Sequence, residues 1–548
     1  MVANDTMRER GATIVLEASY WPADTSEPVL ESTVGGVLRA AAAATPNGLA
    51  LTAGVADPRA RRQWTYAELL DEAERAARSL VSKFEPGEHI AIWAHNIPEW
   101  VILEYAIGLA GLVLVTVNPA LRPDEVKYVL TQSKAAGLFH VESFRDQSLA
   151  RIVETLASDL PELRTVVSFS DWGKFLDAGG PETVLPEVLP DDPAQIQYTS
   201  GTTGFPKGAR LHHRGITNNA RFITNSYSKG AHCLLTPMPL FHTGGCVMGV
   251  LGACSDRQHL VLVEYFDPAL VLELIETYRV EVAGGVPTML IAMINHPDFA
   301  ARDISSLTAV GSGGAMVPPG LVRNIEDSLG VKFVIVYGQT EMSPILTMTR
   351  KDDDLEDRCN TVGHPMAAWE VQVVDPVSGE IVAPGIEGEI CSRGYGNMID
   401  YFDMPEKTAE TIDPDGWLHS GDLGTMDERG YVRITGRLKD MIIRGGENIF
   451  PAEIENRLFA HPSIANVAVV GVPDETWGEQ VGAVVQLAEG ATLDIAALNA
   501  FCRETLASHK VPRLWYRTDD YPLTGSGKVQ KYVLVEQISK GTLQPFTG

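Results

Sequence analysis

The chain has 548 residues, of which 45% are hydrophobic and 21% are charged, so it can bury a large core and is not a disordered protein. One hydrophobic core rarely grows beyond about 300 residues, and the length therefore predicts two or more domains. Lys and Arg number 44 against 71 Asp and Glu, and the resulting net charge of −27 argues against a general binder of nucleic acid or anionic membranes.

The six cysteines are sparse and form no C-x-x-C pair, which is typical of reduced, buried thiols and predicts a cytoplasmic protein. The first 20 residues lack the apolar run of a secretory signal. Uncharged stretches at residues 105–121 and 231–255 are interrupted by Gly and Pro. We therefore expect buried elements there, the second lining a cavity, rather than transmembrane helices. Peripheral contact with a membrane stays open.

Residues 1–30 show no clear hydrophobic period and are interpreted as a loose leader. Thr65 and Glu68 have the spacing of a capping box, and the apolar series after them predicts a helix over residues 69–80. Strands are predicted at residues 89–93 and 112–117, with a helix that Asn96 and Pro98 open between them. This order indicates a parallel sheet covered by helices, and similar alternation continues to about residue 350.

The sequence pattern changes in the last third of the chain. Glycine-punctuated strands and turns over residues 371–433 predict a more antiparallel part. A compact tail begins after residue 440, with strands predicted at residues 464–472 and 482–487 and a helix led by Asp494. This mixture of elements predicts a small α+β domain.

The motif with the strongest chemical signal covers residues 198–208, directly after a predicted strand at residues 194–198. It is rich in Gly, Thr and Ser and ends in Lys207 and Gly208. Glycines let successive N–H groups converge on one anion, hydroxyls add donors, and the lysine adds a positive charge. The pattern predicts a cradle for a polyphosphate, although not a Walker A loop, because Pro206 stands where that loop needs glycine.

A weaker motif, residues 337–341, follows a predicted apolar strand at residues 333–336. Ligands bind at strand ends in open α/β sheets. Tyr337 has the ring to stack on a flat base, Thr340 has a hydroxyl for a phosphate, and the Glu341 carboxylate suits Mg²⁺. Taken alone, the motif is equally consistent with a structural turn.

Two further stretches are also ambiguous by themselves. Asp422, at the end of residues 416–422, suits a pair of ribose hydroxyls, and Arg437 would add a charged donor. Lys528 lies on a Gly/Ser-rich loop that could bring a cation to a reacting phosphate. Each is otherwise a surface turn or a solvated charge.

Several catalytic motifs are absent from the sequence. It has no G-x-S-x-G, no H-E-x-x-H, no paired Cys/His metal spacing and no G-x-G-x-x-G. The adjacent His212 and His213 would point in different directions, so they are interpreted as surface or hydrogen-bonded histidines and not as metal ligands.

Taken together, the motifs resemble the adenylate-forming acyl-CoA synthetase superfamily, which includes fatty-acid and 4-coumarate CoA ligases, over about residues 35 to 535. The stretches that carry the resemblance are residues 198–208, 239–245, 337–341, 420–422, 436–437, 444–448, 472–475 and 524–528. The resemblance implies an α/β protein with a large N-terminal AMP-binding domain of packed α/β subdomains plus a β-rich subdomain (residues 31–436). It also implies a hinge (437–440) and a small mobile α+β C-terminal domain (441–548).

The resemblance implies a two-step reaction. A carboxylate attacks the α-phosphate of ATP in the presence of Mg²⁺ to give acyl-AMP and pyrophosphate, and the thiol of coenzyme A then takes the acyl group and releases AMP. The implied partners are a small-molecule carboxylic acid, ATP and CoA. A homodimer is left open.

The resemblance also assigns roles to residues of this chain. Lys528 would bridge the carboxylate and the α-phosphate, Thr340 would contact the α-phosphate, and Glu341 would position Mg²⁺. His242 would gate the acyl pocket or form part of its wall. Further residues are implied to hold ATP or CoA or to form the hinge between the two domains. They are Thr199, Ser200, Gly201, Thr202, Thr203, Gly204, Lys207, Gly313, Gly314, Ala315, Tyr337, Gly338, Asp422, Arg437, Lys439, Gly445 and Gly446.

The small residues of the implied pocket, at residues 241–245 and 311–314, favour an aliphatic medium-to-long-chain acid. Aromatic or hydroxycinnamic acids are the next alternative, followed by polycyclic or sterol-derived acids. A non-CoA acceptor such as a carrier protein, a luciferase-like oxygenase and a nucleotide-binding protein without catalysis are the other hypotheses. Dependence on free CoA tests for a non-CoA acceptor, and light emission or O₂ uptake tests for an oxygenase. The intact set of Glu341, Asp422, Arg437 and Lys528 argues against a protein without catalysis.

Overall fold

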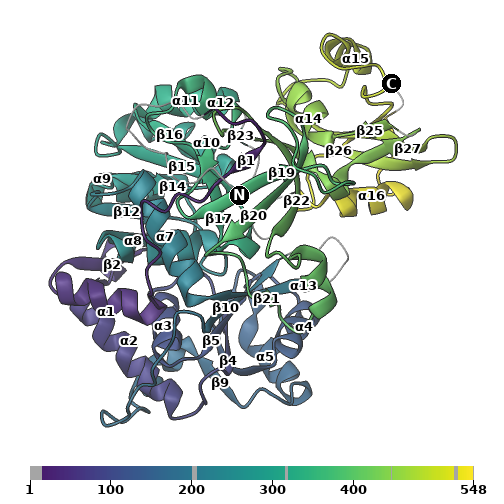
Figure 1. The fold of residues 1–548 in the computed structure, drawn as a ribbon. Coiled ribbons are helices and arrows are strands. Elements are labelled where there is room, and N and C mark those ends of the chain that lie inside the picture. The colour runs from purple at the N-terminus through teal and green to yellow at the C-terminus, as the bar shows by residue number, and fades with distance from the viewer. Residues whose placement is uncertain are drawn as a thin grey trace.

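The computed structural model describes residues 15–199, 206–314, 317, 319–445, 447–523 and 529–546 (Figure 1). The main parts of the molecule are two large sheets with helices packed on them, a third antiparallel sheet and a small C-terminal lobe. A two-stranded hairpin, β7 (Ser143–Phe144) and β8 (Gln147–Ser148), adds to them. The mixed α/β class predicted from the sequence is confirmed. No helix among these residues is both long and apolar enough to cross a membrane.

The first sheet has seven strands in the order β21-β11-β10-β5-β4-β6-β9, and its central strands pair in parallel. The strands are β4 (His89–Trp93), β5 (Val113–Val117), β6 (Ala135–His140), β9 (Thr165–Ser168), β10 (Pro193–Thr199), β11 (Lys207–His212) and β21 (Asp400–Tyr401). The helices that follow or flank them are α2 (Tyr66–Val81), α3 (Pro98–Leu109), α4 (Pro123–Gln132), α5 (Leu149–Leu156) and α6 (Trp172–Leu176).

Two local sequence signals of this part are confirmed. At the start of α2 the Thr65 hydroxyl accepts a bond from the Glu68 N–H, and the Glu68 carboxylate accepts the Thr65 N–H at 2.8 Å, so the capping box is complete. Helix α3 lies between β4 and β5, as predicted, and its residues from Trp100 to Leu109 are all buried. A helix buried on all sides belongs in the interior, which explains why its sequence shows no polar stripe.

The second sheet has nine strands in the order β18-β17-β16-β15-β14-β12-β13-β2-β3. They are β2 (Leu49–Gly54), β3 (Gln63–Thr65), β12 (Cys233–Thr236), β13 (His259–Val263), β14 (Val282–Gly284), β15 (Ala309–Gly313), β16 (Lys332–Gly338), β17 (Ile345–Met348) and β18 (His364–Pro365). The helices around it are α1 (Val34–Ala44), α7 (His213–Tyr227), the π-helix η4 (Gly244–Leu251), α8 (Gly252–Ser255), α9 (Pro268–Tyr278), α10 (Pro287–Ile294), α11 (Pro319–Leu329) and α12 (Leu355–Asn360).

The third sheet is antiparallel, as predicted for residues 371–433. Its strands, in spatial order, are β1 (Tyr20–Trp21), β19 (Trp369–Val374), β20 (Gly388–Gly394), β22 (Leu418–Met426) and β23 (Val432–Arg437), and helix α13 (Pro405–Thr411) lies beside it in sequence. This sheet lies between the parallel sheets and the C-terminal lobe (Figure 1).

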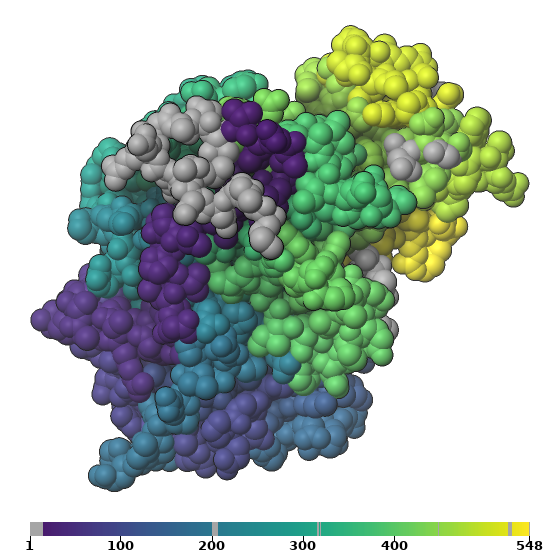
Figure 2. Space-filling view, viewed as in Figure 1, coloured from purple at the N-terminus to yellow at the C-terminus, as the bar shows by residue number. Residues whose placement is uncertain are grey.

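The C-terminal residues form a lobe with its own sheet and core, and Figure 2 shows it (yellow) set off from the rest of the molecule. Its elements are β24 (Ile442–Arg444), β25 (Glu447–Ile449), α14 (Pro451–Phe459), β26 (Ile464–Asp474), β27 (Gly478–Leu487), α15 (Ile495–Arg503), β28 (Leu514–Arg517) and α16 (Lys531–Ser539). Both predicted strands exist but run longer, because β26 and β27 form one antiparallel hairpin that pairs as far as its turn. Asp494 caps α15, as predicted.

Residues 15–32 are more ordered than the expected loose leader. β1 pairs with β19 at the outer edge of the third sheet, and Leu16 N–H donates to the Glu428 carbonyl at 2.8 Å. Trp21 is buried against Gly430, where a Cβ would come within 2.1 Å of its ring. Residues 15–32 are here called the strap. They lack a hydrophobic period because they run across other elements and contain only the two-residue strand β1.

Candidate functional site

A cavity of about 580 Å³ opens at the carboxyl ends of the strands of the second sheet and extends to the third sheet. The residues predicted from the sequence that line it are Thr199, Lys207, His242, Gly313, Gly314, Gly338, Thr340, Glu341, Asp422, Arg437 and Lys439. The structure therefore brings residues from three sheets around one space.

Other predicted residues lie elsewhere. Tyr337 is behind the lining, and Gly445 lies in a turn of the C-terminal lobe, where its N–H donates to the Trp477 carbonyl at 2.8 Å. Those that lie outside the described residues are Ser200, Gly201, Thr202, Thr203, Gly204, Ala315, Gly446 and Lys528.

The turn after β16 needs glycine. The predicted strand at residues 333–336 extends to Gly338, so Tyr337 lies within β16 and not after it. A Cβ at Gly338 would come within 2.1 Å of the Pro344 carbonyl oxygen. This close approach lets the chain turn into the short 3₁₀-helix η6 (Thr340–Met342), which carries Thr340 and Glu341 to the cavity.

Asp422 is 4% exposed and is held by three donors from the ends of two strands, β16 and β23. The Arg437 guanidinium lies 2.9 Å from its Oδ1, while Tyr337 Oη and Gln339 Nε2 donate to its Oδ2 at 2.9 and 2.8 Å. Asp422 and Arg437 are direct partners between β22 and β23, so the sheet register itself sets the ion pair. A carboxylate held this rigidly, with lone pairs left on Oδ1, suits recognition of hydroxyl donors.

Neighbouring charges and burial shift the pKa values of the groups around Asp422 and Arg437. Burial by itself would lower the pKa of Arg437, but the negative charges of Asp422 and Asp440 outweigh it and raise the pKa. Burial, together with the nearby Asp422 charge, raises the pKa of Tyr337 well above its ordinary value. Tyr337 therefore stays a donor and Arg437 stays a cation. Lys439 shares the cavity, and burial and the Arg437 charge both lower its pKa.

Glu341, Tyr401 and Lys207 form a second group in the cavity. Glu341 is 8% exposed, and its Oε1 accepts a bond from Tyr401 Oη at 2.7 Å. The Lys207 ammonium lies 3.9 Å from the centre of the Tyr401 ring, and its burial lowers its pKa. A buried carboxylate oxygen is the type of ligand that Mg²⁺ takes in proteins, so the donor set at Glu341 fits that ion.

A pair of residues on β20 and β22 supports the backbone beside Asp422. Glu389 Oε1 accepts the Gly421 N–H at 2.9 Å, and its Oε2 lies 2.8 Å from His419 Nδ1. The hydrogen bond to Glu389 raises the pKa of His419. Together with Cys391 these two side chains have ligand atoms within 4.8 Å of one another, which would allow a metal ion, but Glu389 and His419 already bond each other.

An apolar arm of the cavity runs between α7 and the second sheet. Its described apolar lining is Ile223, Leu234, Leu235, Met238, Met248, Val286, Val334 and Val336. In the strand register, Leu234 on β12 is paired with Val282 on β14, and Val282 is paired with Ala309 on β15. Ala309 lies four residues before Gly313 on the same strand. At about 3.3 Å per residue the arm is therefore about 13 Å long below the level of Gly313. The predicted cavity lining within residues 231–255 is confirmed.

Three polar side chains along this arm are bonded to the protein, whereas Ser312, which also lines the cavity, has a buried Oγ without a hydrogen-bond partner among the described residues. Tyr227 Oη donates to the Ala283 carbonyl at 2.8 Å, and Thr224 Oγ1 donates to the Gly252 carbonyl at 3.0 Å. Thr236 Oγ1 accepts the Met238 N–H at 3.2 Å. The arm thus presents mainly hydrocarbon and bonded hydroxyls to whatever enters it.

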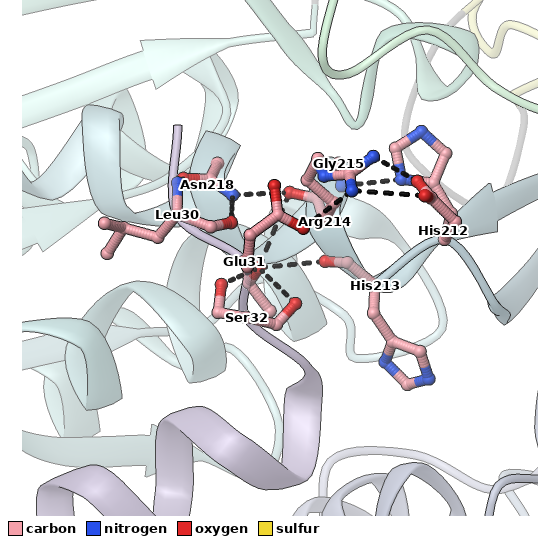
Figure 3. A network of polar contacts seen from close by, with 10 residues as sticks. Leu30, Glu31, Ser32, His212, His213, Arg214, Gly215 and Asn218 are labelled. Atoms are coloured by element: carbon pink, nitrogen blue, oxygen red, sulfur yellow. Dashed lines mark hydrogen bonds and ion pairs between the residues drawn. The ribbon is translucent and has the colours of Figure 1, made fainter. Parts of the chain in front are cut away.

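Helix α7, which forms one wall of the arm, is fixed at its N-terminus by both predicted histidines. His212 is its N-cap, and His212 Nδ1 accepts the Gly215 N–H at 2.8 Å (Figure 3). His213 is 0% exposed, and its Nδ1 accepts the Val34 N–H at 3.2 Å. Burial lowers the pKa of His213 to about 3, so it stays a neutral acceptor. The interpretation of these histidines as hydrogen-bonded is confirmed.

The strap crosses the same end of α7 (Figure 3). Asn218 Oδ1 accepts the Leu30 N–H and its Nδ2 donates to the Leu30 carbonyl, both at 2.8 Å. Arg214 donates to Glu31 at 2.7 Å. The hydroxyl of Thr217, on the second turn of the helix, lies 2.7 Å from that of Ser32. The N-terminal strap therefore anchors the helix that lines the arm.

Four residues that line the cavity were missed by sequence reasoning. Gln339 and His419 lie inside motifs that were recognised, at residues 337–341 and 416–422, so their positions alone could have suggested them. Tyr401 and Glu389 are isolated in the sequence and carry no local signal. Only the pairing of β21 with β11 and of β20 with β22 brings them to the site.

Comparison with known proteins gives two family matches. Residues 38–402 match the model of the AMP-binding enzyme family, and residues 453–528 match the AMP-binding enzyme C-terminal domain. Together they cover most of the chain.

Curated relatives and solved structures agree. The putative acyl-CoA synthetase YngI of Bacillus subtilis is 39% identical over 541 residues, covering 93% of this chain and 97% of that protein. The mitochondrial medium-chain acyl-CoA ligase ACSF2 of Rattus norvegicus is 35% identical, covering 95% of this chain and 90% of its own. The crystal structure of ATP-bound MatB from Rhodopseudomonas palustris superposes with a TM-score of 0.84 at 29% identity, covering 93% and 99% of the two chains.

Proposed function

The chain belongs to the AMP-binding enzyme family and is an AMP-forming acyl-CoA ligase that acts through an acyl-adenylate, and we propose that its acid is a medium-to-long straight-chain fatty acid. ATP and CoA are its other substrates. The observation that carries the proposal is the apolar arm, whose hydroxyls at Thr224 and Tyr227 are already bonded to backbone carbonyls.

The chemistry of the arm separates the candidate acids. A site that selects a hydroxylated aromatic acid needs polar groups that are left unpaired without that substrate, because such groups give its discrimination. Here the donors of Tyr227 and Thr224 are satisfied internally, and the surrounding lining is aliphatic. An alkyl chain gains about 0.8 kcal/mol per buried methylene in such a site. The name of the relative ACSF2, a medium-chain acyl-CoA ligase, agrees with this choice.

For the nucleotide, we propose that the residues keep the roles that the resemblance implies. Asp422 and Arg437 would hold the ribose and Thr340 the α-phosphate. A carboxylate and ATP are both anions, so the cavity must supply positive charge where they meet. Half-buried Lys207 and the more exposed Lys439 line that space and would supply it. Mg²⁺, which Glu341 would hold, neutralises phosphate charge when bound.

The remaining assignments concern the C-terminal part. We propose that Lys528 bridges the acid and the α-phosphate in the first step, and that residues 437–440 are a hinge between residues 31–436 and 441–548. Such a hinge absorbs backbone change when a domain rotates. Gly445 and Gly446 would then approach the CoA thiol in the second step.

A pyrophosphate-release screen tests the acid class. The purified protein, ATP and Mg²⁺ are mixed with straight-chain, aromatic, hydroxycinnamic and sterol-derived acids, each with and without CoA. We expect the highest kcat/KM with straight-chain acids and thioester formation only when CoA is present. A preference for an aromatic or polycyclic acid would refute the proposed substrate. An Asp422→Asn variant, which weakens ribose recognition, serves as the low-activity control for all acids.

A further inference from the structure

Tyr227 crosses the apolar arm from one wall to the other. It is the last residue of α7, and its hydroxyl donates to the Ala283 carbonyl on β14 at 2.8 Å. On the neighbouring strand β15, a Cβ at Gly311 would come within 3.0 Å of the Tyr227 hydroxyl oxygen. Glycine at 311 therefore leaves the space that lets the ring reach the sheet.

The position of the ring along the arm follows from the strand register. Ala283 is paired with Val310, which lies three residues before Gly313 on β15. The tyrosine therefore meets the sheet about 10 Å below the level where the nucleotide residues begin. Ser228 and Leu234 line the cavity near the same far end. An acyl chain that enters from the nucleotide side meets the ring only after most of its length is buried.

We propose that the Tyr227 ring, tethered to Ala283 and accommodated by Gly311, sets the upper limit of acyl chain length. This inference rests on the proposed function. The hydroxyl bond to Ala283 fits the ring's position across the arm, and the volume of the ring itself blocks further methylenes. Below the limit each added methylene raises kcat/KM about three- to fourfold, and above it the chain must displace a buried ring and the rate falls.

The test measures kcat/KM for saturated acids from butyrate to stearate in the full-length enzyme. In Tyr227→Ala the optimum is expected to move by at least two methylenes toward longer acids, because the ring volume is removed. In Gly311→Ala it is expected to move toward shorter acids, because the new methyl pushes the ring into the arm. Opposite shifts in the preferred chain length are expected if the ring limits the length of the arm. General destabilisation of the fold would not produce shifts of opposite direction.

Two controls separate ring volume from other effects. Tyr227→Phe keeps the ring, so its optimum is expected to stay within one methylene of the wild type, whereas a shift as large as that of the alanine variant would overturn the inference. Tyr278→Ala removes a tyrosine that does not line the cavity and is expected to leave the optimum unchanged. Thermal shifts on adding ATP verify that each variant folds and binds nucleotide.

The outcomes distinguish this inference from the proposed function. If the wild type activates no straight-chain acid, the proposed function fails. If it activates them but Tyr227→Ala and Gly311→Ala, both folded, keep the wild-type length optimum, only the role of Tyr227 fails.

Discussion

Tyr401 contacts two charged residues of opposite sign in the cavity. It donates to Glu341, and its ring faces the Lys207 ammonium. The pKa of Tyr401 is raised by burial first and by the Glu341 charge second, so the phenol remains a donor. It is a positioning residue for the carboxylate that the Mg²⁺ proposal uses.

A Tyr401→Phe variant tests this role because it removes the hydroxyl but keeps the ring under Lys207. A hydrogen bond to a charged group contributes about 1.5–3 kcal/mol, so we expect adenylation to fall on the order of tenfold or more. The Mg²⁺ concentration for half-maximal binding of ATP should rise as well, measured by calorimetry without an acid substrate. An unchanged Mg²⁺ dependence would mean that Tyr401 has only a structural role.

The His419–Glu389 pair predicts a pH dependence of stability. The pKa of His419 is raised from its ordinary value of 6.5, chiefly by the bond to Glu389. A raised pKa in the folded state means that the protonated histidine stabilises the fold. The contribution is complete below pH 6.5 and is lost as the pH rises through the higher folded pKa.

His419→Gln therefore should lower the melting temperature most at acid pH. The difference from the wild type should shrink as the solution is made alkaline, and a difference that grew with pH would have the wrong sign. Melting curves of both proteins across a pH series measure it.

At the scale of elements, the strap and α7 act as one unit. Asn218 makes two hydrogen bonds to the backbone of Leu30, and Asn225, two turns further along the helix, makes one with Glu27. We expect Asn218→Ala to cost about 1–3 kcal/mol in free energy of unfolding, because it leaves an N–H and a carbonyl of the strap without these partners. Asn225→Ala should cost less. Urea unfolding measures both, and equal losses would contradict the anchoring role.

The elements differ in how far the sequence determines them. The α2 helix and strand β4 follow from local patterns. Thr65 and Glu68 cap the helix, and the strand has an apolar run at residues 90–93. Strand β1 has only two residues and forms because β19 offers an edge, which no local pattern reveals. Thr340 and Glu341 were likewise found in a motif, whereas Tyr401 reaches Glu341 only through the pairing of distant strands.

At the scale of the whole molecule, the proposed two-step reaction requires two arrangements of the C-terminal lobe. The segment η7 (Leu438–Asp440) connects β23 of the third sheet to β24 of the lobe, and Lys439 in it lines the cavity. The connecting segment has three residues, and a change in their backbone angles would move the lobe as a body.

Two variants separate the half-reactions. Lys528→Ala should nearly abolish acyl-AMP formation, by on the order of 10²–10³ in rate, and largely spare thioester formation from supplied acyl-AMP. Lys439→Pro should do the reverse, because proline restricts the backbone change of the hinge. Pyrophosphate release measures the first step and CoA thioester formation from acyl-AMP the second. Equal losses in both steps for either variant would contradict its assignment.

The strap also has a consequence for N-terminal trimming. β1 is the edge strand of the third sheet, and Trp21 covers Gly430 next to it. Removal of the chain up to a protease cut between residues 21 and 33 would expose the backbone donors and acceptors of β19 together with the apolar surface that Trp21 covers. An open strand edge recruits other chains. The trimmed enzyme should therefore self-associate in gel filtration, and affinity tags are better placed ahead of residue 15 than substituted for the strap.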